Sequence, residues 1–162
     1  MMEQPRSNRG RTSSPLVGSR VRIPFPTFLS KMTAIKNLGI LLKSMNPVLA
    51  KGKFVICTVS DAKREKLCNR PLLIFREREG ITVIIEKGIA DAENLSYKNI
   101  WSMITLNVHS DLNAVGFLAA ITKKLAQHEI SVNAVSAYYH DHLFVPNEKA
   151  NQAMKLLKEL SE

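Results

Sequence analysis

The stretch from Ile104 to Val145 constrains the fold of this chain of 162 residues more than any other part of it. It begins with ITLNVH, where apolar and polar side chains alternate, which is typical of a strand with one buried face. A helix is then predicted by the spacing of Leu118, Ile121, Leu125 and His128. Strands at 130–139 and 142–145 follow, joined by a short reversal at 140–141. A strand, a helix and two further strands make up most of a ferredoxin-like unit.

The turn after the first of these strands leads directly into the N-terminus of the predicted helix. Ser110 or Asp111 can cap that helix by accepting hydrogen bonds from its free N–H groups. Those N–H groups carry a partial positive charge, so the turn is suited to a carboxylate or another anionic group. Gly116 has no side chain and allows a ligand or a neighbouring strand to approach closely.

The order of residues in this stretch resembles the ACT domain, a small regulatory module that binds amino acids. The ACT pattern is a strand, an acidic residue, a turn with glycine, an amphipathic helix and a short entry to the next strand. The matching places here are Asp111, Asn113, Gly116 and 129–133. The subfamily related to the CASTOR amino-acid sensors is similar in longer runs, namely NVHS at 107–110, AVG at 114–116 and YYHDHLFVP at 138–146.

The resemblance covers nearly all of the chain from Thr33 onwards and implies two ACT-like halves in tandem. The expected fold class is α+β, with tandem ferredoxin-like halves, antiparallel sheets and helices on one face. We expect a disordered basic tail at 1–31, an N-terminal ACT-like half at 32–99 and a C-terminal ACT domain at 100–162.

Two complete ferredoxin-like units would need eight strands, and the sequence predicts fewer. Strands are predicted at 53–60, 71–76, 81–86, 101–109, 131–139 and 142–146. We therefore expect the two halves to share or exchange strands, in one continuous sheet or in two sheets side by side. Helices are predicted after a cap at Thr33, at 89–95 and at 147–160, and 61–70 is predicted to be a loop with a short helical turn.

The resemblance also implies where a ligand binds. In ACT modules the capped turn and the start of the next strand lie close together at an interface between modules, where an amino acid is held. Asp111 would then pair with the ammonium group or a basic side chain. The N–H groups of Val115 and Gly116 would meet the carboxylate, and Asn133 could bond to both. The implied site is Ser110, Asp111, Asn113, Ala114, Val115, Gly116 and Asn133. Capping alone also explains Ser110 or Asp111, although it does not explain Asn133.

Neither catalysis nor metal binding is predicted. His140 and His142 can lie on one face of an extended segment, but a zinc site needs three or four ligands and no further ligand is marked. Cys57 and Cys68 lack the surroundings of a nucleophile and are too few for a disulfide framework. The glycines are scattered and form no phosphate-binding loop. We expect a binding protein with no catalytic residue, no metal and no cofactor.

Residues 1–31 differ from the rest, with six basic residues, one acid and four prolines. An acid-poor leader rich in arginine and serine is typical of a transit peptide, and positive charge also attracts nucleic acid. A solvated extension is the third alternative, since Met32 offers a second start. No apolar run reaches the length of a membrane span.

These observations predict a cytoplasmic, non-catalytic regulatory protein that binds a small molecule, in particular an amino acid, at an ACT module interface. The alternative is an ACT-fold scaffold for protein interactions that has lost ligand binding. The expected partners are an amino acid or a similar small ligand and a second copy of the chain or another protein. No membrane is expected, and nucleic acid is the least favoured partner. A mitochondrial location is the alternative if residues 1–31 act as a transit peptide.

Overall fold

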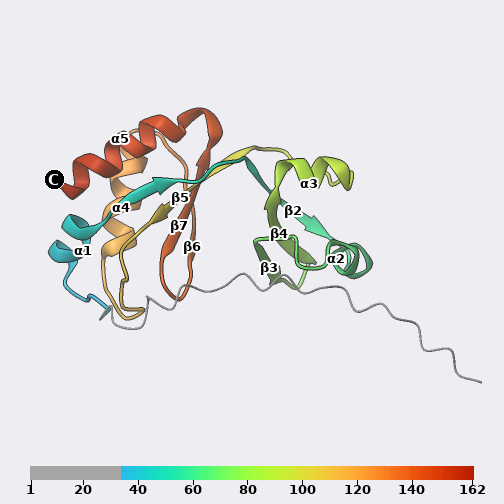
Figure 1. Ribbon diagram of the computed structural model, residues 1–162, viewed down its shortest axis with the longest axis horizontal. Coiled ribbons are helices and arrows are strands. Elements are labelled where there is room, and N and C mark those ends of the chain that lie inside the picture. The colour runs from blue at the N-terminus through green and yellow to red at the C-terminus, as the bar shows by residue number, and fades with distance from the viewer. Residues whose placement is uncertain (1–33) are drawn as a thin grey trace, which may run out of the picture. The chain divides into compact units, whose positions relative to one another are not determined.

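Seven antiparallel strands form one sheet in the computed structural model, which describes residues 34–162 (Figure 1). The strands are β1 (Pro47–Leu49), β2 (Phe54–Val59), β3 (Leu73–Arg76), β4 (Ile81–Glu86), β5 (Trp101–Leu106), β6 (Asn133–Ser136) and β7 (Asp141–Pro146). Their order is β3-β4-β2-β5-β7-β6, and β1 pairs with β5. The predicted tail at 1–31 and the predicted cap at Thr33 lie outside the described residues.

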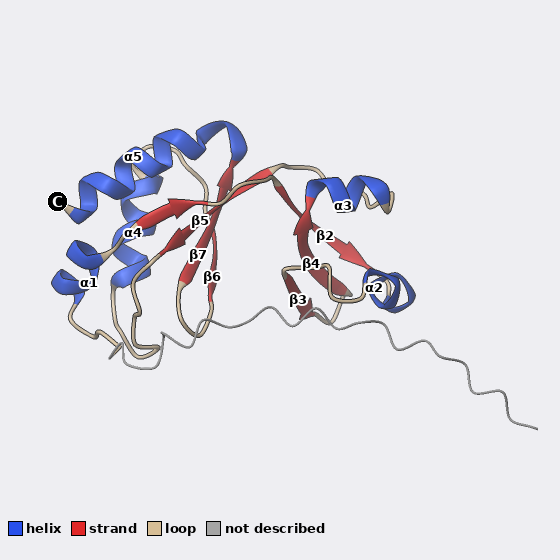
Figure 2. Ribbon diagram, in the orientation of Figure 1, coloured by secondary structure: helices blue, strands red, loops and turns tan. Residues whose placement is uncertain are grey.

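The helices pack on one face of this sheet (Figure 2). They are α1 (Leu38–Ser44), α2 (Asp61–Leu67), α3 (Lys87–Ala92), α4 (Phe117–Ala126) and α5 (Ala150–Ser161), the last preceded by a 3₁₀ turn, η2 (Asn147–Lys149). Val55 of β2 packs with α2 and α3, and Ile104 of β5 packs with α1, α4 and α5. Phe54 and Trp101 are paired across β2 and β5 and contribute to a separate cluster on the opposite face. This arrangement confirms the predicted α+β class.

β1 and β2 are consecutive in the chain but belong to different halves of the sheet. β1 lies along β5, so that β1-β5-β7-β6 have the strand order of a ferredoxin-like unit. β2 joins β4 and β3, and its only partner in β5 is Trp101. The halves therefore share strands, as the strand count predicted. The division into halves at residues 99 and 100 stays a prediction, because α1 of the first half packs with α4 and α5 of the second.

The start of α4 differs from the prediction. Neither Ser110 nor Asp111 caps it: its N-cap is Gly116, in the left-handed conformation with φ of 91°, and no side chain bonds to its first turn. The reason is a second turn in the loop, where the N–H of Ala114 donates to the carbonyl of Asp111 and delays the helix. The buried stripe of α4 consists of Phe117, Ile121 and Leu125, while the predicted Leu118 is half-buried and His128 is exposed beyond the helix end.

Two further elements differ from their predicted boundaries. Residues 61–67 form the helix α2, capped by Ser60, where we predicted a loop with a short helical turn. The predicted strand at 131–139 is ladder-paired only along β6, Asn133–Ser136. Among the described residues, no helix has the length and apolar character needed to cross a membrane.

A third apolar cluster lies on the face of the sheet that carries no helices. Phe54, Ile84 and Phe144 form its centre, and Trp101 and Met103 pack against them. The rings of Phe54 and Phe144 meet edge to face with their centroids 5.8 Å apart. This cluster connects β2 and β4 to β7, and so links the two halves.

Candidate functional site

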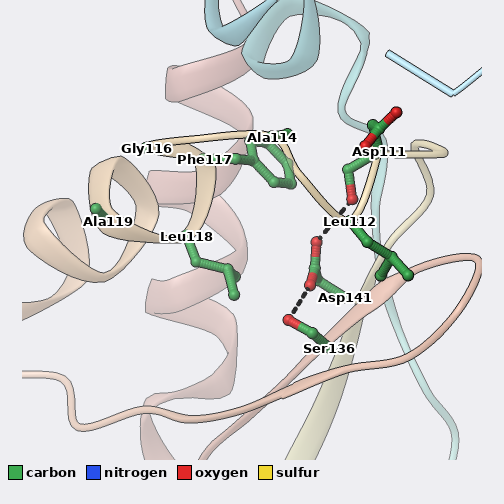
Figure 3. Close-up of a pocket in the computed structure, with 10 residues that line it drawn as sticks. Asp111, Leu112, Ala114, Gly116, Phe117, Leu118, Ala119, Ser136 and Asp141 are labelled. Atoms are coloured by element: carbon green, nitrogen blue, oxygen red, sulfur yellow. Dashed lines mark hydrogen bonds between the residues drawn. The ribbon is translucent and has the colours of Figure 1, made fainter. Parts of the chain in front are cut away.

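The loop between β5 and α4 and the hairpin between β6 and β7 enclose a cavity of about 160 Å³ (Figure 3). Ser110 and Asp111 of the loop lie on one side of it, and the first residues of α4 lie on another. Ser136 of β6 and Asp141 of β7 complete the lining. The cavity therefore joins residues that are up to 31 positions apart in the chain.

Asp141 is the buried charge of this cavity, with only 6% of its surface exposed. Its two carboxylate oxygens accept hydrogen bonds from Ser136 Oγ at 2.6 Å and from Ser110 Oγ at 3.2 Å (Figure 3). Within residues 34–162 no basic side chain forms an ion pair with it. Burying a carboxylate is costly unless it is paired, so a cation in the cavity would find a strong partner here.

The N-terminus of α4 supplies the opposite partial charge. The N–H groups of the first helical turn have no intrahelical acceptor, and Gly116 offers no side chain to cap them. Phe117, Leu118 and Ala119 of this turn line the cavity. A Cβ at Gly116 would lie 3.4 Å from Leu38 Cδ2, and its φ of 91° is strained for any other residue. The helix end is thus open to an anionic group.

Asp111 already has partners within the protein. Its Oδ1 accepts hydrogen bonds from the backbone N–H of Asn113 at 2.8 Å and from the Asn113 side chain at 3.1 Å. These bonds form an Asx turn, and the backbone bond is the main reason that the pKa of Asp111 lies below its usual value. The exposed Lys36 ammonium lies 3.7 Å from the other oxygen. Asp111 therefore shapes the loop and lies at the rim of the cavity.

The segment before α1 holds this loop in place. The N–H of Ile35 donates to the carbonyl of His109 at 3.0 Å, and the N–H of Asp111 donates to the carbonyl of Ile35 at 3.0 Å. Ile35 and Ser110 thus form a short parallel bridge. The site depends on a segment more than seventy residues away in the sequence, which no local pattern could indicate.

The structure brings together only part of the predicted site. Ser110, Asp111, Ala114 and Gly116 surround the cavity. The other three predicted residues lie elsewhere: Asn113 lines a neighbouring hollow with His109 and Tyr138, Val115 is 84% exposed, and Asn133 pairs with Phe144 at the far end of β6 from Ser136.

Sequence reasoning missed Ser136 and Asp141, the two residues of the hairpin that face the cavity. We interpreted His140-Asp141 as a reversal, where an aspartate commonly satisfies backbone N–H groups. The available signal was the position of Asp141 immediately before the apolar run of β7, which makes it the first residue of a central strand.

The two histidines of the β6–β7 hairpin region have structural partners. His140 Nδ1 lies 3.4 Å from the carbonyl of Val108, and His142 Nδ1 lies 3.0 Å from Thr105 Oγ1. Among residues 34–162 no three His, Cys, Asp or Glu side chains are grouped closely enough to hold a metal ion. Cys57 and Cys68 are both free thiols, and burial raises the pKa of Cys57.

Comparisons with known proteins agree with the observed fold. Models of the ACT domain match residues 33–102 and residues 96–159. The crystal structure of VC0802 from Vibrio cholerae, described as a protein of unknown function and "possible transport protein", is 45% identical, with a TM-score of 0.71 over 80% of this chain and 100% of that one. A search of curated proteins finds no match.

More distant structures share the fold alone. The ligand-free regulatory subunit of aspartate kinase from Thermus thermophilus is 11% identical, with a TM-score of 0.57 over 72% of this chain and 96% of that one. The regulatory subunit of aspartate kinase from Thermus flavus is 9% identical, with a TM-score of 0.53 over 73% of this chain and 97% of that one.

Proposed function

Because this chain belongs to the ACT domain family and carries two such domains in tandem, we propose that it is a non-catalytic regulatory protein that binds a free amino acid beside the N-terminus of α4. The family and the aspartate kinase regulatory subunits support a regulatory, ligand-binding role in general. The choice of ligand class depends on the cavity itself.

One observation carries the proposal: the cavity has a helix N-terminus without a side-chain cap on one wall, and on another the Asp141 carboxylate, which forms no ion pair within residues 34–162. A free amino acid is a zwitterion that carries both complementary charges a short distance apart. Its carboxylate would accept hydrogen bonds from the first N–H groups of α4, and its ammonium would donate to Asp141. A volume of about 160 Å³ suits the charged backbone of an amino acid, with the side chain directed towards the open mouth.

In this proposal the residues that contact the amino acid differ from those of the predicted site. Asp141 takes the ammonium in place of Asp111, which is already bonded to Asn113 and lies near Lys36. Ser110 and Gly116 keep their places, as a hydroxyl beside the carboxylate and as the residue that leaves the helix end open. Asn113, Val115 and Asn133 do not line this cavity and are not part of the proposed site.

The first half offers no second site of this kind. Its β2 and α2 are separated by Ser60 alone, and Ser60 Oγ caps α2 by accepting from the N–H of Lys63. Asp61 at the start of α2 is paired with Arg76 at 3.1 Å. We therefore propose one amino acid per chain, bound in the second half.

A protein-interaction scaffold is the second candidate. Leu112, Val115 and Tyr138 are large apolar side chains near the same loop, and each is at least two-thirds exposed. Such a cluster is typical of a contact with another protein, which could be a second copy of the chain. The two free cysteines are compatible with the cytoplasmic location that we propose.

A thermal-shift screen of the twenty common amino acids against the full chain separates these candidates. Binding to the folded state alone raises the melting temperature. Our proposal predicts that at least one amino acid raises it and that methyl ester and N-acetyl derivatives of that amino acid do not. No shift with any amino acid, together with self-association that persists, would instead support the scaffold.

A further inference from the structure

A second cavity, of about 210 Å³, lies on the face of the sheet that carries no helices. Leu72 and Leu73 line it from the first half, and Met103, Val135, His142 and Phe144 line it from the second. Phe144 is only 1% exposed and belongs to the apolar cluster that connects the halves. The floor of the cavity is therefore formed by a packed apolar cluster and not by loops alone.

The lining is apolar except for one imidazole. His142 lies beside Val135 across the β6–β7 ladder and beside Thr105 across the β5–β7 ladder, with its ring on the same face as theirs. Its Nδ1 is 3.0 Å from Thr105 Oγ1, and no described residue forms a hydrogen bond with its Nε2. A ligand in the cavity would thus meet one ring nitrogen that is free to form a hydrogen bond.

The surroundings of His142 favour an uncharged ring. Burial lowers its pKa most, and the nearby His140 lowers it further, against the opposing effect of Asp141. An uncharged imidazole in an apolar pocket interacts with a neutral polar group at little desolvation cost. A charged ligand would find no counter-charge among the side chains that line the cavity.

We propose that this cavity binds a small uncharged molecule made of one apolar ring and one hydroxyl or similar group, which forms a hydrogen bond with Nε2 of His142. A hydroxyl suits either tautomer of the ring, because it can both donate and accept. An apolar cavity of about 150 Å³ is known to hold benzene, so about 210 Å³ leaves room for a ring with one substituent. This site does not depend on the proposed amino-acid site.

Other occupants fit less well. A second copy of the chain would have to insert a protruding side chain to reach Phe144, because a flat sheet face cannot enter a cavity of this size. If a second copy did occupy the cavity, phenol would compete with it for the same site. Phenol affinity would then fall as the protein concentration rises, and that result would overturn the proposal.

The test uses the full chain, phenol and toluene as probes, and amide-proton NMR as the readout. Phenol should shift the signals of Met103, Val135, His142 and Phe144 in a saturable way. Val135→Trp fills the cavity from β6. It should weaken phenol binding at least about tenfold, because the apolar ring of phenol can then no longer be buried there. Thr58→Trp adds the same bulk to the same sheet face outside the cavity and should leave binding unchanged.

The hydrogen bond is tested separately. His142→Phe keeps an aromatic ring and should weaken phenol binding roughly two- to tenfold while leaving toluene binding unchanged, since only phenol uses the bond. The exposed His128→Phe serves as its control and should have no effect. If phenol does not saturate, if its shifts lie elsewhere, or if Val135→Trp folds and binds phenol as wild type does, the site does not exist.

Discussion

Asp141 and His142 are consecutive residues of β7, and their side chains lie on opposite faces of the sheet. Asp141 pairs with Leu106 and faces the cavity beside α4, where Ser110 and Ser136 donate to it. His142 pairs with Thr105 and lines the apolar cavity on the other face. One short strand thus supplies the central polar group of both cavities.

The first prediction concerns the stability cost of Asp141. Asp141→Asn keeps an acceptor and a donor for the two serine hydroxyls and removes a buried charge, so the free energy of unfolding should stay the same or rise. Asp141→Ala leaves both hydroxyls without their acceptor and should cost about 1–3 kcal/mol. Urea denaturation of the two variants and wild type measures this. A large loss in Asp141→Asn would mean that the charge itself holds the hairpin to the loop.

The second prediction concerns Gly116. Its φ of 91° is unfavourable for a residue with a Cβ, so Gly116→Ala should destabilise the fold by about 1–3 kcal/mol. Gly88 is the matched control, because it lies in α3 and a Cβ there meets nothing within 4 Å. Gly88→Ala should be neutral or stabilise by up to about 1 kcal/mol. Thermal unfolding of both variants tests this, and equal effects would show that the turn tolerates a side chain.

The third prediction concerns the phase of α4. Ile121 is fully buried between the sheet and the other helices, so Ile121→Ala should cost about 2–5 kcal/mol. Leu118 is half-buried, and Leu118→Ala should cost clearly less. Lys124→Ala removes only a partly exposed ion pair with Glu159 and should change stability by no more than about 0.5 kcal/mol. The reverse order for Ile121 and Leu118 would mean that the helix is rotated.

These three sites show what the sequence could and could not predict. The alternation in β5, the hairpins and the shared strands follow from local patterns and from a strand count, so they were predictable. The predicted buried positions Ile121 and Leu125 of α4 were correct, and Phe117 rather than Leu118 is the first buried residue of the helix. Leu118 and Phe117 are both apolar, and spacing alone does not choose between them. The role of Asp141 depends on contacts with Ser110, 31 residues away, and such contacts leave no local signature.

The fourth prediction concerns pH. The pKa of His142 is lower in the folded state than in the unfolded chain, mainly through burial, so the unfolded state takes up the proton more readily. The contribution of His142 to stability is therefore complete above the unfolded value of about 6.5 and is lost as the pH falls below it. Thr105 and Val135 lie beside His142 across the two ladders, and His140 and Asp141 are the charged groups that act on its pKa.

The comparison that isolates this effect is His142→Gln, which cannot titrate. Wild type should lose more stability than His142→Gln between about pH 7 and about pH 5, as measured by urea denaturation at each pH. Parallel curves for the two proteins would show that His142 remains equally protonated in both states.

The central claim is that the Asp141 carboxylate and the open end of α4 hold a free amino acid. Calorimetry with the amino acid that gives the largest thermal shift tests it most directly, on wild type, Asp141→Asn and the first-half control Asp61→Asn. We predict one site per chain, a loss of about ten- to hundredfold in affinity for Asp141→Asn because a charge-assisted hydrogen bond to the ammonium is removed, and no change for Asp61→Asn. Wild-type affinity in a folded Asp141→Asn, or no binding by wild type at all, would contradict the claim.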